Sequence, residues 1–335
     1  MEYRNFGRTG MKVSPLCLGC MMFGGRTEPE DSYPIIDKAI DAGINFLDTA
    51  NVYSRGNSET VTGQALQRNG KREHIVLATK VHGKMDDDDP NMLGNSRRHI
   101  IQQCEASLKR LQTDWIDLYQ IHRPQPDIPI DETLRAMDDL VRAGKVRHIG
   151  TSTFAAWQVV ESLWASKELG LNRFVSEQPP YHLLDRRIER ELIPMAQTYG
   201  IGLLPWSPLA GGLLTDKYKR GDMSAEGRWK DGQQGPAHRQ ISDAVFDIKE
   251  CLDALARDKG CTQSQLAIAW AVHQPGITSP IIGPRTMEQL EDNLKALDID
   301  VTDDDREKID AVAPPGSVVT KYYEANFGPH AHRVV

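Results

Sequence analysis

The chain is organised around residues 43–53, which read GINFLDTANVY. Residues 44–47 form a short apolar run that predicts a buried strand, and this run stops at the carboxylate of Asp48. A polar loop follows and carries Tyr53, five residues after Asp48. A buried strand that ends in a charged side chain is typical of the carboxyl edge of a parallel sheet or barrel, where ligands bind.

Two other predicted strands end in the same way. Residues 75–79 run into Lys80, and residues 116–121 run into His122. Any one of these polar side chains is more simply explained by a strand end that meets water. Because the carboxyl ends of parallel strands gather at one face, however, we expect four such side chains to meet there and form one site. They are Asp48, Tyr53, Lys80 and His122.

Strands and helices alternate along the chain. Apolar runs predict eight strands, near residues 15–18, 44–47, 75–79, 116–121, 146–149, 174–177, 201–204 and 280–282. Amphipathic segments predict helices between them, near residues 31–42, 57–69, 96–110, 131–143, 155–169, 187–199, 263–273 and 286–296. Residues 1–13 predict a hairpin, and two further helices are expected, near residues 242–259 and after residue 301.

This alternation predicts right-handed βαβ units and a parallel sheet. Eight units favour the α/β class and a closed (β/α)8 TIM barrel, with the N-terminal hairpin, long loops at the C-terminal face and two extra helices, as a single domain over residues 1–335. An open doubly wound sheet is the alternative. The turn after the first strand, LGCMMFGG at residues 18–25, lacks the G-x-G-x-x-G pattern of a Rossmann fold.

The composition is typical of a soluble globular protein, with 39% hydrophobic residues and a net charge of −7. This charge predicts no broad basic surface for nucleic acid or anionic lipid. No apolar stretch approaches the roughly 20 residues that a membrane span requires, and the first residues lack the apolar run of a signal peptide.

Cysteine usage points to the same kind of protein. The five cysteines are sparse and odd in number, which favours a reducing compartment, so the expected location is cytoplasmic. Cys17 and Cys20 have the spacing of a metal or redox pair, but no second Cys or His pair completes a zinc site, so we expect no metal.

The four side chains suit proton transfer to a carbonyl oxygen. A phenol is a weak acid at neutral pH, and a neighbouring ammonium lowers its pKa by favouring the anion. Lys80 is placed to supply that charge, and Asp48 to hold Lys80 by an ion pair. Tyr53 is therefore the candidate general acid for a developing alkoxide, and His122 a hydrogen-bond donor to the same oxygen.

Several motifs, in this order, resemble those of the aldo-keto reductase family, in the branch that includes the potassium-channel β-subunit-like reductases. They are LG at 18–19 with FG at 23–24, NFLDTA at 45–50 with Tyr53, TK at 79–80, DLYQIH at 117–122, GKVRHIGTS at 144–152, WSPL at 206–209 and PIIGPR at 280–285. The likeness covers nearly the whole chain. It implies a barrel that binds NADPH in extended form and reduces small aldehydes and ketones to alcohols.

The resemblance also implies a role for each matching residue. Tyr53 is the general acid, with Asp48, Lys80 and His122 as its partners. The nicotinamide end of the cofactor would lie against Asp48, Ser152, Gln178 and Trp206. The pyrophosphate would meet the backbone of Ser207, Leu209 and Gly211, and the resemblance also counts Pro208 among the cofactor-binding residues. The adenosine end would be enclosed by Gly283, Arg285, Gln289, Asp292 and Asn293.

Cofactor choice depends most on Arg285, because a guanidinium can grip the 2′-phosphate of NADPH or NADP+ with paired hydrogen bonds. Lys217 and Arg228 are candidates to add to that contact, and NADH is the less favoured cofactor. Two positions depart from the family pattern. Thr153 stands where the family usually has Asn or Arg, and Asp292 where it often has Glu.

Two other functions remain open at this point. A cofactor-binding, redox-sensing or scaffold subunit would keep the same site but turn over slowly. A Schiff-base lyase would use Lys80 as a nucleophile, although pairing with Asp48 would keep that lysine charged. The sequence also leaves open whether the protein is a monomer or a homo-oligomer, and which carbonyl compound it takes.

Overall fold

The protein is described here by a computed structural model that covers residues 1–227 and 241–320. Its centre is an eight-stranded parallel sheet in the order β10-β3-β4-β5-β6-β7-β8-β9. The strands are β3 (Cys17–Gly19), β4 (Phe46–Asp48), β5 (Val76–Val81), β6 (Ile116–Ile121), β7 (Val146–Ser152), β8 (Phe174–Gln178), β9 (Gly202–Leu203) and β10 (Ile281–Ile282).

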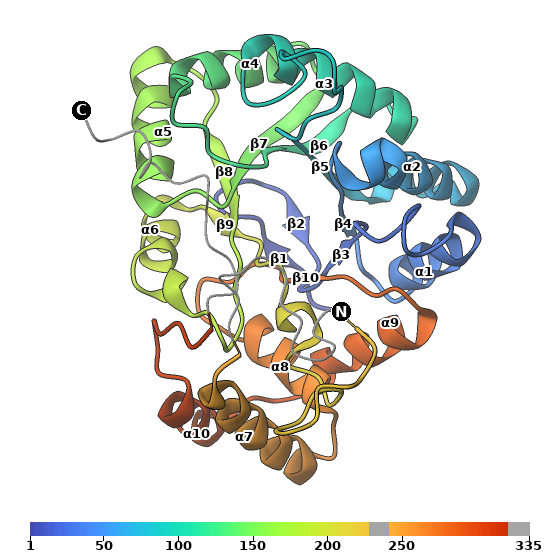
Figure 1. Cartoon of the computed structure of the whole chain (residues 1–335). Helices are drawn as coiled ribbons and strands as arrows, with labels where there is room; N and C mark the ends of the chain where they lie inside the picture. Colours follow the sequence, from blue (N-terminus) through green and yellow to red (C-terminus); the bar gives the residue numbers. More distant parts are fainter. Residues whose placement is uncertain (228–240, 321–335) are drawn as a thin grey trace.

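The sheet closes on itself, as the alternation of strands and helices predicts (Figure 1). Bridges from Leu203 to Ile277 and from Trp206 to Ile281 join its two ends, and the Ile281 N–H donates to the Pro205 carbonyl at 2.7 Å. The fold is therefore a (β/α)8 barrel, and the open-sheet alternative is wrong.

Helices surround the barrel in Figure 1. They are α1 (Pro29–Asp41), α2 (Asn57–Asn69), α3 (Arg97–Leu111), α4 (Ile130–Arg142), α5 (Ala156–Leu169), α6 (Leu192–Tyr199), α8 (Gln263–Val272) and α9 (Met287–Leu294). The two extra helices, α7 (Asp243–Lys259) and α10 (Asp303–Val312), pack side by side at the bottom of that view. No helix within the described residues has the length and apolarity that crossing a membrane requires.

The N-terminal hairpin closes one end of the barrel. Its strands, β1 (Arg4–Asn5) and β2 (Lys12–Val13), pair antiparallel. Phe6 and Val13 are fully buried with Phe46 and Val76 inside the barrel, and the Phe6 and Phe46 rings meet edge to face at 5.8 Å. This apolar plug leaves the opposite, carboxyl end as the place for polar side chains.

Side-chain alternation then separates the barrel interior into layers. On β4, β5 and β6 the apolar residues Phe46, Ala78 and Leu118 belong to the interior cluster. The residue two positions later on each strand lies on the same face, one layer closer to the carboxyl end. Those residues are Asp48, Lys80 and Gln120, so the polar layer follows from strand geometry.

The observed ends of two strands and the start of one helix differ from those that the sequence predicts. Strands β5 and β7 continue to Val81 and Ser152, so Lys80 and Ser152 lie within strands and are held by the sheet. The helix expected from residue 187 is a short 3₁₀ turn at Arg187–Glu189, and α6 begins only at Leu192. Pro194 explains this, because it lacks an N–H and its ring clashes with the carbonyl four residues earlier in a continuing helix.

Helix α2 packs closely on α3 at Gly63. A Cβ added to Gly63 would lie 2.5 Å from the backbone carbonyl of Leu111. A backbone group cannot shift aside as the end of a flexible side chain can. Helix propensity alone favours alanine over glycine by about 1 kcal/mol. Overpacking costs typically about 1–3 kcal/mol, so the two effects oppose one another.

We expect Gly63→Ala to lower the free energy of unfolding by up to about 2 kcal/mol, because the rigid backbone contact makes the steric cost exceed the gain in propensity. Urea denaturation followed by circular dichroism measures the change. Gly10→Ala is the control, since a Cβ there meets nothing within 4 Å. A more stable Gly63→Ala variant would show that α2 does not approach α3 as described.

Candidate active site

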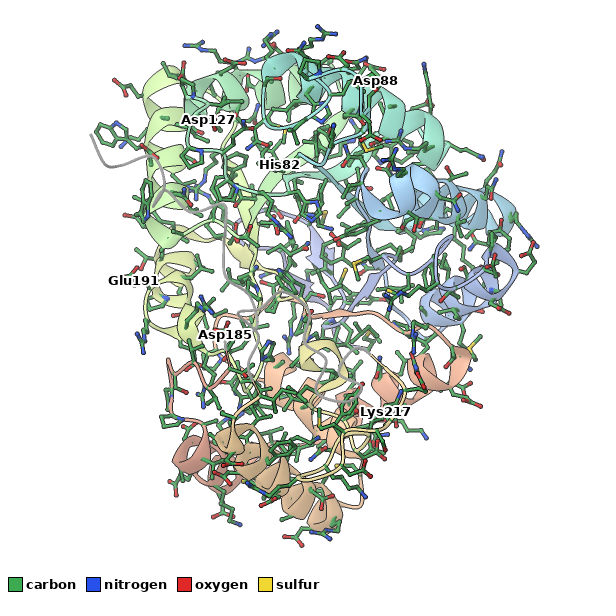
Figure 2. The ribbon with its side chains drawn as sticks, in the orientation of Figure 1. His82, Asp88, Asp127, Asp185, Glu191 and Lys217 are labelled. Atoms are coloured by element: carbon green, nitrogen blue, oxygen red, sulfur yellow. The ribbon has the colours of Figure 1, made fainter. Side chains whose placement is uncertain are left out.

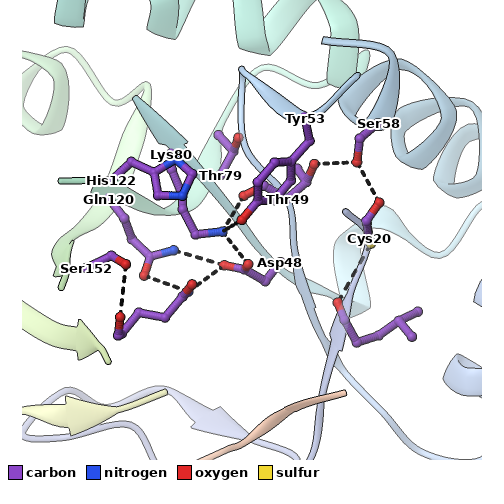
Figure 3. Close-up of polar contacts among 12 residues, drawn as sticks. Cys20, Asp48, Thr49, Tyr53, Ser58, Thr79, Lys80, Gln120, His122 and Ser152 are labelled. Carbon is purple, nitrogen blue, oxygen red and sulfur yellow. Dashed lines mark hydrogen bonds and ion pairs between the residues drawn. The ribbon is translucent and has the colours of Figure 1, made fainter. Parts of the chain in front are cut away.

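Lys80 of β5 and Asp48 of β4 form a buried ion pair at the carboxyl end of the barrel (Figure 3). Lys80 is 0% exposed and Asp48 is 3% exposed. The Lys80 ammonium also donates to the Thr49 carbonyl at 2.7 Å and lies 3.5 Å from the Tyr53 hydroxyl. Burial by itself lowers the pKa of Lys80, but the Asp48 carboxylate and Tyr53 outweigh it and raise that pKa above its ordinary value.

The second oxygen of Asp48 is held by two amides. Gln120 Nε2 donates to it at 3.0 Å and Gln178 Nε2 at 2.9 Å. Gln178 Nε2 also contacts Gln120 Oε1 at 3.2 Å, and the Ser152 hydroxyl donates to the Gln178 carbonyl at 2.9 Å. Strands β4, β5, β6, β7 and β8 thus share one hydrogen-bond network, which fixes the carboxylate and the ammonium in place (Figure 3).

Tyr53 and His122 stand over this network. Tyr53 begins a short 3₁₀ turn, and the next two residues, Ser54 and Arg55, are left-handed, with φ of 48° and 54°. The Tyr53 and His122 rings meet nearly at right angles with their centroids 5.6 Å apart. The Lys80 ammonium lies 5.0 Å from the centre of the Tyr53 ring. The structure therefore brings the four predicted side chains together.

His122 is a neutral imidazole near pH 7. Its side chain is buried, and this burial, with smaller contributions from the charges of Arg123, Lys80 and His82, holds its pKa well below the ordinary value. A neutral imidazole can donate one hydrogen bond to a substrate oxygen without adding a charge to the site.

Gln120 is a member of the network to which the sequence analysis gave no role. It lies two residues before His122 on β6, and residues two apart share one face of a strand. That spacing was sufficient to place Gln120 in the barrel interior beside Asp48. No feature of the sequence identifies the Thr49 carbonyl as a member of the network, because every residue has a backbone carbonyl.

The loop after β9 carries the residues expected to meet the pyrophosphate. Four of its residues are left-handed, namely Ser207, Ala210, Gly211 and Gly212, with φ of 60°, 49°, 66° and 96°. Backbone N–H groups in such turns form concave sites for anions. On this loop Trp206, Ser207, Leu209 and Gly211 are partly exposed and Pro208 is buried, so the loop offers an accessible backbone that fits a pyrophosphate.

The segment from β10 to α9 suits a further phosphate. Gly283 and Arg285 are exposed, and Thr286 caps the N-terminus of α9, where partial positive charge favours anions. Gln289 accepts from the Arg285 N–H at 2.8 Å. Within residues 1–227 and 241–320, neither Arg285 nor Lys217 has a carboxylate within ion-pair distance. Both cations are thus available to an anionic ligand.

The last three predicted cofactor residues have separate outcomes. Asn293 is buried on α9. The Asp292 carboxylate accepts from Gln265 Nε2 of α8 at 2.7 Å, so it is already engaged at the start of that helix. Arg228 lies outside the described residues.

Two further loops border the carboxyl end of the barrel. The loop after β5 and the loop after β6 are joined by Asn95, whose N–H donates to Gln125 Oε1 at 2.7 Å and whose side-chain amide donates to the Arg123 carbonyl at 2.9 Å. Figure 2 shows His82 and Asp88 on the first of these loops and Asp127 on the second, while Lys217 lies well apart from them.

Comparison with known proteins agrees with this geometry. The profile of the Aldo/keto reductase family matches residues 15–314. The chain belongs to the aldo/keto reductase family. As an aldo/keto reductase it is an oxidoreductase, and this family generally uses nicotinamide cofactors and small-molecule substrates.

Three relatives illustrate the range of aldo/keto reductases that resemble this chain. It is 40% identical over 332 residues to an uncharacterized oxidoreductase, YrpG, of Bacillus subtilis, which covers 96% of this chain and 99% of the relative. It is 38% identical over 303 residues to a probable voltage-gated potassium channel subunit beta of Arabidopsis thaliana, with coverage of 89% and 92%. It is 33% identical over 341 residues to a versiconal hemiacetal acetate reductase of Aspergillus parasiticus, with coverage of 95% and 98%.

Thr153 marks a strained point of this aldo/keto reductase. It follows Ser152 directly and has φ of 61°, a left-handed conformation that a β-branched residue rarely adopts. Its hydroxyl donates to the Ser152 carbonyl at 2.6 Å, and its N–H donates to the Gln178 carbonyl at 3.2 Å. Asparagine tolerates this conformation better, because its side chain is not branched at Cβ.

We expect Thr153→Asn to stabilise the protein by about 1 kcal/mol, which raises the midpoint of thermal unfolding by roughly 2 °C. Differential scanning calorimetry measures the shift. Thr153→Val is the matched control, since it keeps the branched Cβ and therefore the strain. Equal shifts in the two variants would show that the backbone conformation is not the cause.

Proposed function

We propose that this protein is an NADPH-dependent reductase of aldehydes and ketones, with Tyr53 as the general acid. The observation that carries the proposal is the Tyr53 hydroxyl, which lies 3.5 Å from the buried Lys80 ammonium and beside the neutral His122. A phenol so placed is suited to give up a proton, because the adjacent positive charge stabilises the phenolate that remains. The reductase among the relatives supports the same chemistry.

When bound, the cofactor supplies a hydride to the carbonyl carbon of the substrate. Tyr53 and His122 donate hydrogen bonds to the carbonyl oxygen, where negative charge develops. Tyr53 then transfers its proton to that oxygen, and the Lys80 ammonium stabilises the tyrosinate. Asp48 forms an ion pair with Lys80 and is itself held by Gln120 and Gln178, so the ammonium stays charged and at a fixed position.

The residues of the rim fit NADPH. Gln178 donates to Asp48 and Ser152 donates to the Gln178 carbonyl, so these two residues would hold the nicotinamide carboxamide, and Trp206 would stack on the ring. The left-handed turn at Ala210–Gly212 suits the pyrophosphate. Arg285 and Lys217 suit the 2′-phosphate, which NADH lacks, so we propose NADPH as the preferred cofactor.

A second candidate function is that of a cofactor-binding subunit with weak turnover. It is favoured by the relatives named as potassium channel β subunits, such as that of Arabidopsis thaliana. The two functions differ in a direct measurement. A reductase consumes NADPH when an aldehyde is added, whereas a sensing subunit binds NADPH tightly and shows negligible turnover.

We expect Tyr53→Phe to lower kcat for aldehyde reduction by about 10²–10⁴-fold, which is the usual contribution of a general acid. NADPH binding should be nearly unchanged, because the hydroxyl serves the substrate oxygen. Loss of NADPH absorbance measures turnover, and quenching of protein fluorescence measures cofactor affinity.

Tyr33→Phe is the matched control for this experiment. Tyr33 lies on the outer helix α1, where its hydroxyl donates only to Gln64 among the described residues, at 2.7 Å. That variant should reduce aldehydes at the wild-type rate. Undiminished turnover in Tyr53→Phe would remove the mechanism, and absence of turnover in the wild type would favour the sensing subunit.

We expect Arg285→Met to weaken NADPH binding by about 10–100-fold, as loss of a charge-assisted phosphate contact does, and to leave NADH binding unchanged. Fluorescence titration with both cofactors measures the two affinities. Arg306→Met, on α10, is the control for the general loss of a positive charge. Equal weakening for NADH and NADPH would place Arg285 away from the 2′-phosphate.

A further inference from the structure

Helix α7 contributes a buried lysine to the underside of the loop that follows β9. Lys249 is 5% exposed, and its ammonium donates to the carbonyls of Leu213, at 2.9 Å, and Thr215. It also donates to Gln263 Oε1 of α8 at 3.1 Å, and the Gln263 amide donates back to the Lys249 carbonyl at 2.5 Å. Lys249 thus joins α7, α8 and the loop.

This lysine differs from Lys80 in its partners. In the described part of the chain no carboxylate lies within ion-pair distance of Lys249, so neutral oxygens alone satisfy its ammonium. An ammonium buried among neutral groups is rare and costly, since the lost hydration is not offset by an opposite charge. A countercharge supplied by a ligand would reduce that cost.

The contacts of Lys249 fall within the segment assigned above to the cofactor. Leu213 and Thr215 lie between the left-handed turn at Ala210–Gly212 and the exposed Lys217. On its other side the same loop is tied to α7 at the surface, where Arg220 pairs with Asp243, Asp247 and Glu250. Those pairs are exposed and therefore weak, so Lys249 is the stronger attachment.

We propose that Lys249 is a positioning residue for the cofactor: it anchors the loop of residues 206–217 and adds a buried positive charge beneath the anion site, so that NADPH binding and protonation of Lys249 favour one another. The inference rests on the proposed function, because it assigns the anion site to NADPH. It concerns a residue that contacts the loop and not the cofactor.

The coupling predicts a particular pH dependence. In the ligand-free protein, burial lowers the pKa of Lys249 to about 8. Asp216 on the loop and Asp253 on α7 oppose this shift with smaller effects, and Lys219 adds a small effect in the same direction as burial. Helix α8 faces it with the neutral Gln263. A bound polyanion raises the pKa of a nearby ammonium. Affinity should therefore be constant below about pH 8 and fall as pH rises above it, because the free protein loses the proton there.

The experiment is fluorescence titration of the full-length protein with NADPH from about pH 7 to pH 9.5 at fixed ionic strength, a range in which the 2′-phosphate is already ionised. Lys249→Met should bind about tenfold more weakly at neutral pH, as loss of a charge-assisted hydrogen bond predicts, and its affinity should not fall above about pH 8. Calorimetry in two buffers with different ionisation enthalpies should show proton uptake near pH 8.5 for the wild type alone.

Two further variants keep the test independent of folding. Lys259→Met removes a lysine from the same helix, where it pairs with Asp305 at 2.8 Å, and should bind NADPH as the wild type does. Lys249→Gln retains hydrogen-bond donors without the charge, and should abolish proton uptake while the thermal unfolding midpoint stays close to that of the wild type.

Wild-type affinity and proton uptake in Lys249→Gln or Lys249→Met would overturn the inference and leave the proposed reductase intact. A wild-type protein that fails to bind NADPH at any pH would instead overturn the proposed function together with the inference. The two failures are therefore distinguishable.

Discussion

The ion pair between Lys80 and Asp48 is the interaction on which the rest of the site depends. Both charges are removed from water, which is costly unless each has further partners. The Thr49 carbonyl completes the contacts of Lys80, and the amides of Gln120 and Gln178 complete those of Asp48. Removal of one charge would leave the other uncompensated, at a cost of about 3–5 kcal/mol, so stability and function share this network.

The barrel explains why this pair forms where it does. The N-terminal hairpin fills one end with apolar side chains, and strand alternation stacks polar ones at the other. Different loops surround that polar end. Those after β5 and β6 are joined by the hydrogen bonds of Asn95, while the loop after β9 and the start of α9 offer left-handed turns and cations that suit the phosphates of the proposed cofactor.

The sequence predicted the barrel because each strand is a short apolar run between amphipathic helices. It predicted that Asp48 and Lys80 meet because each stands at the carboxyl end of a strand. It placed the start of α6 wrongly, since Pro194 breaks the pattern inside an otherwise helical segment. The strain at Thr153 and the contacts of Lys249 were not predictable. Both depend on backbone atoms brought together by the fold, and the residue type alone does not encode such contacts.

The state of Lys80 distinguishes a proton-transfer site from a Schiff-base lyase, which requires a neutral amine. The most direct test is nitrogen NMR of protein labelled with 15N at the lysine side chain, with the Lys80 signal assigned by its loss in Lys80→Met. Because Asp48 and Tyr53 raise its pKa, the Lys80 nitrogen should remain an ammonium at a pH where the exposed lysines begin to lose their protons. A Lys80 signal that titrates before those of the exposed lysines would contradict the account.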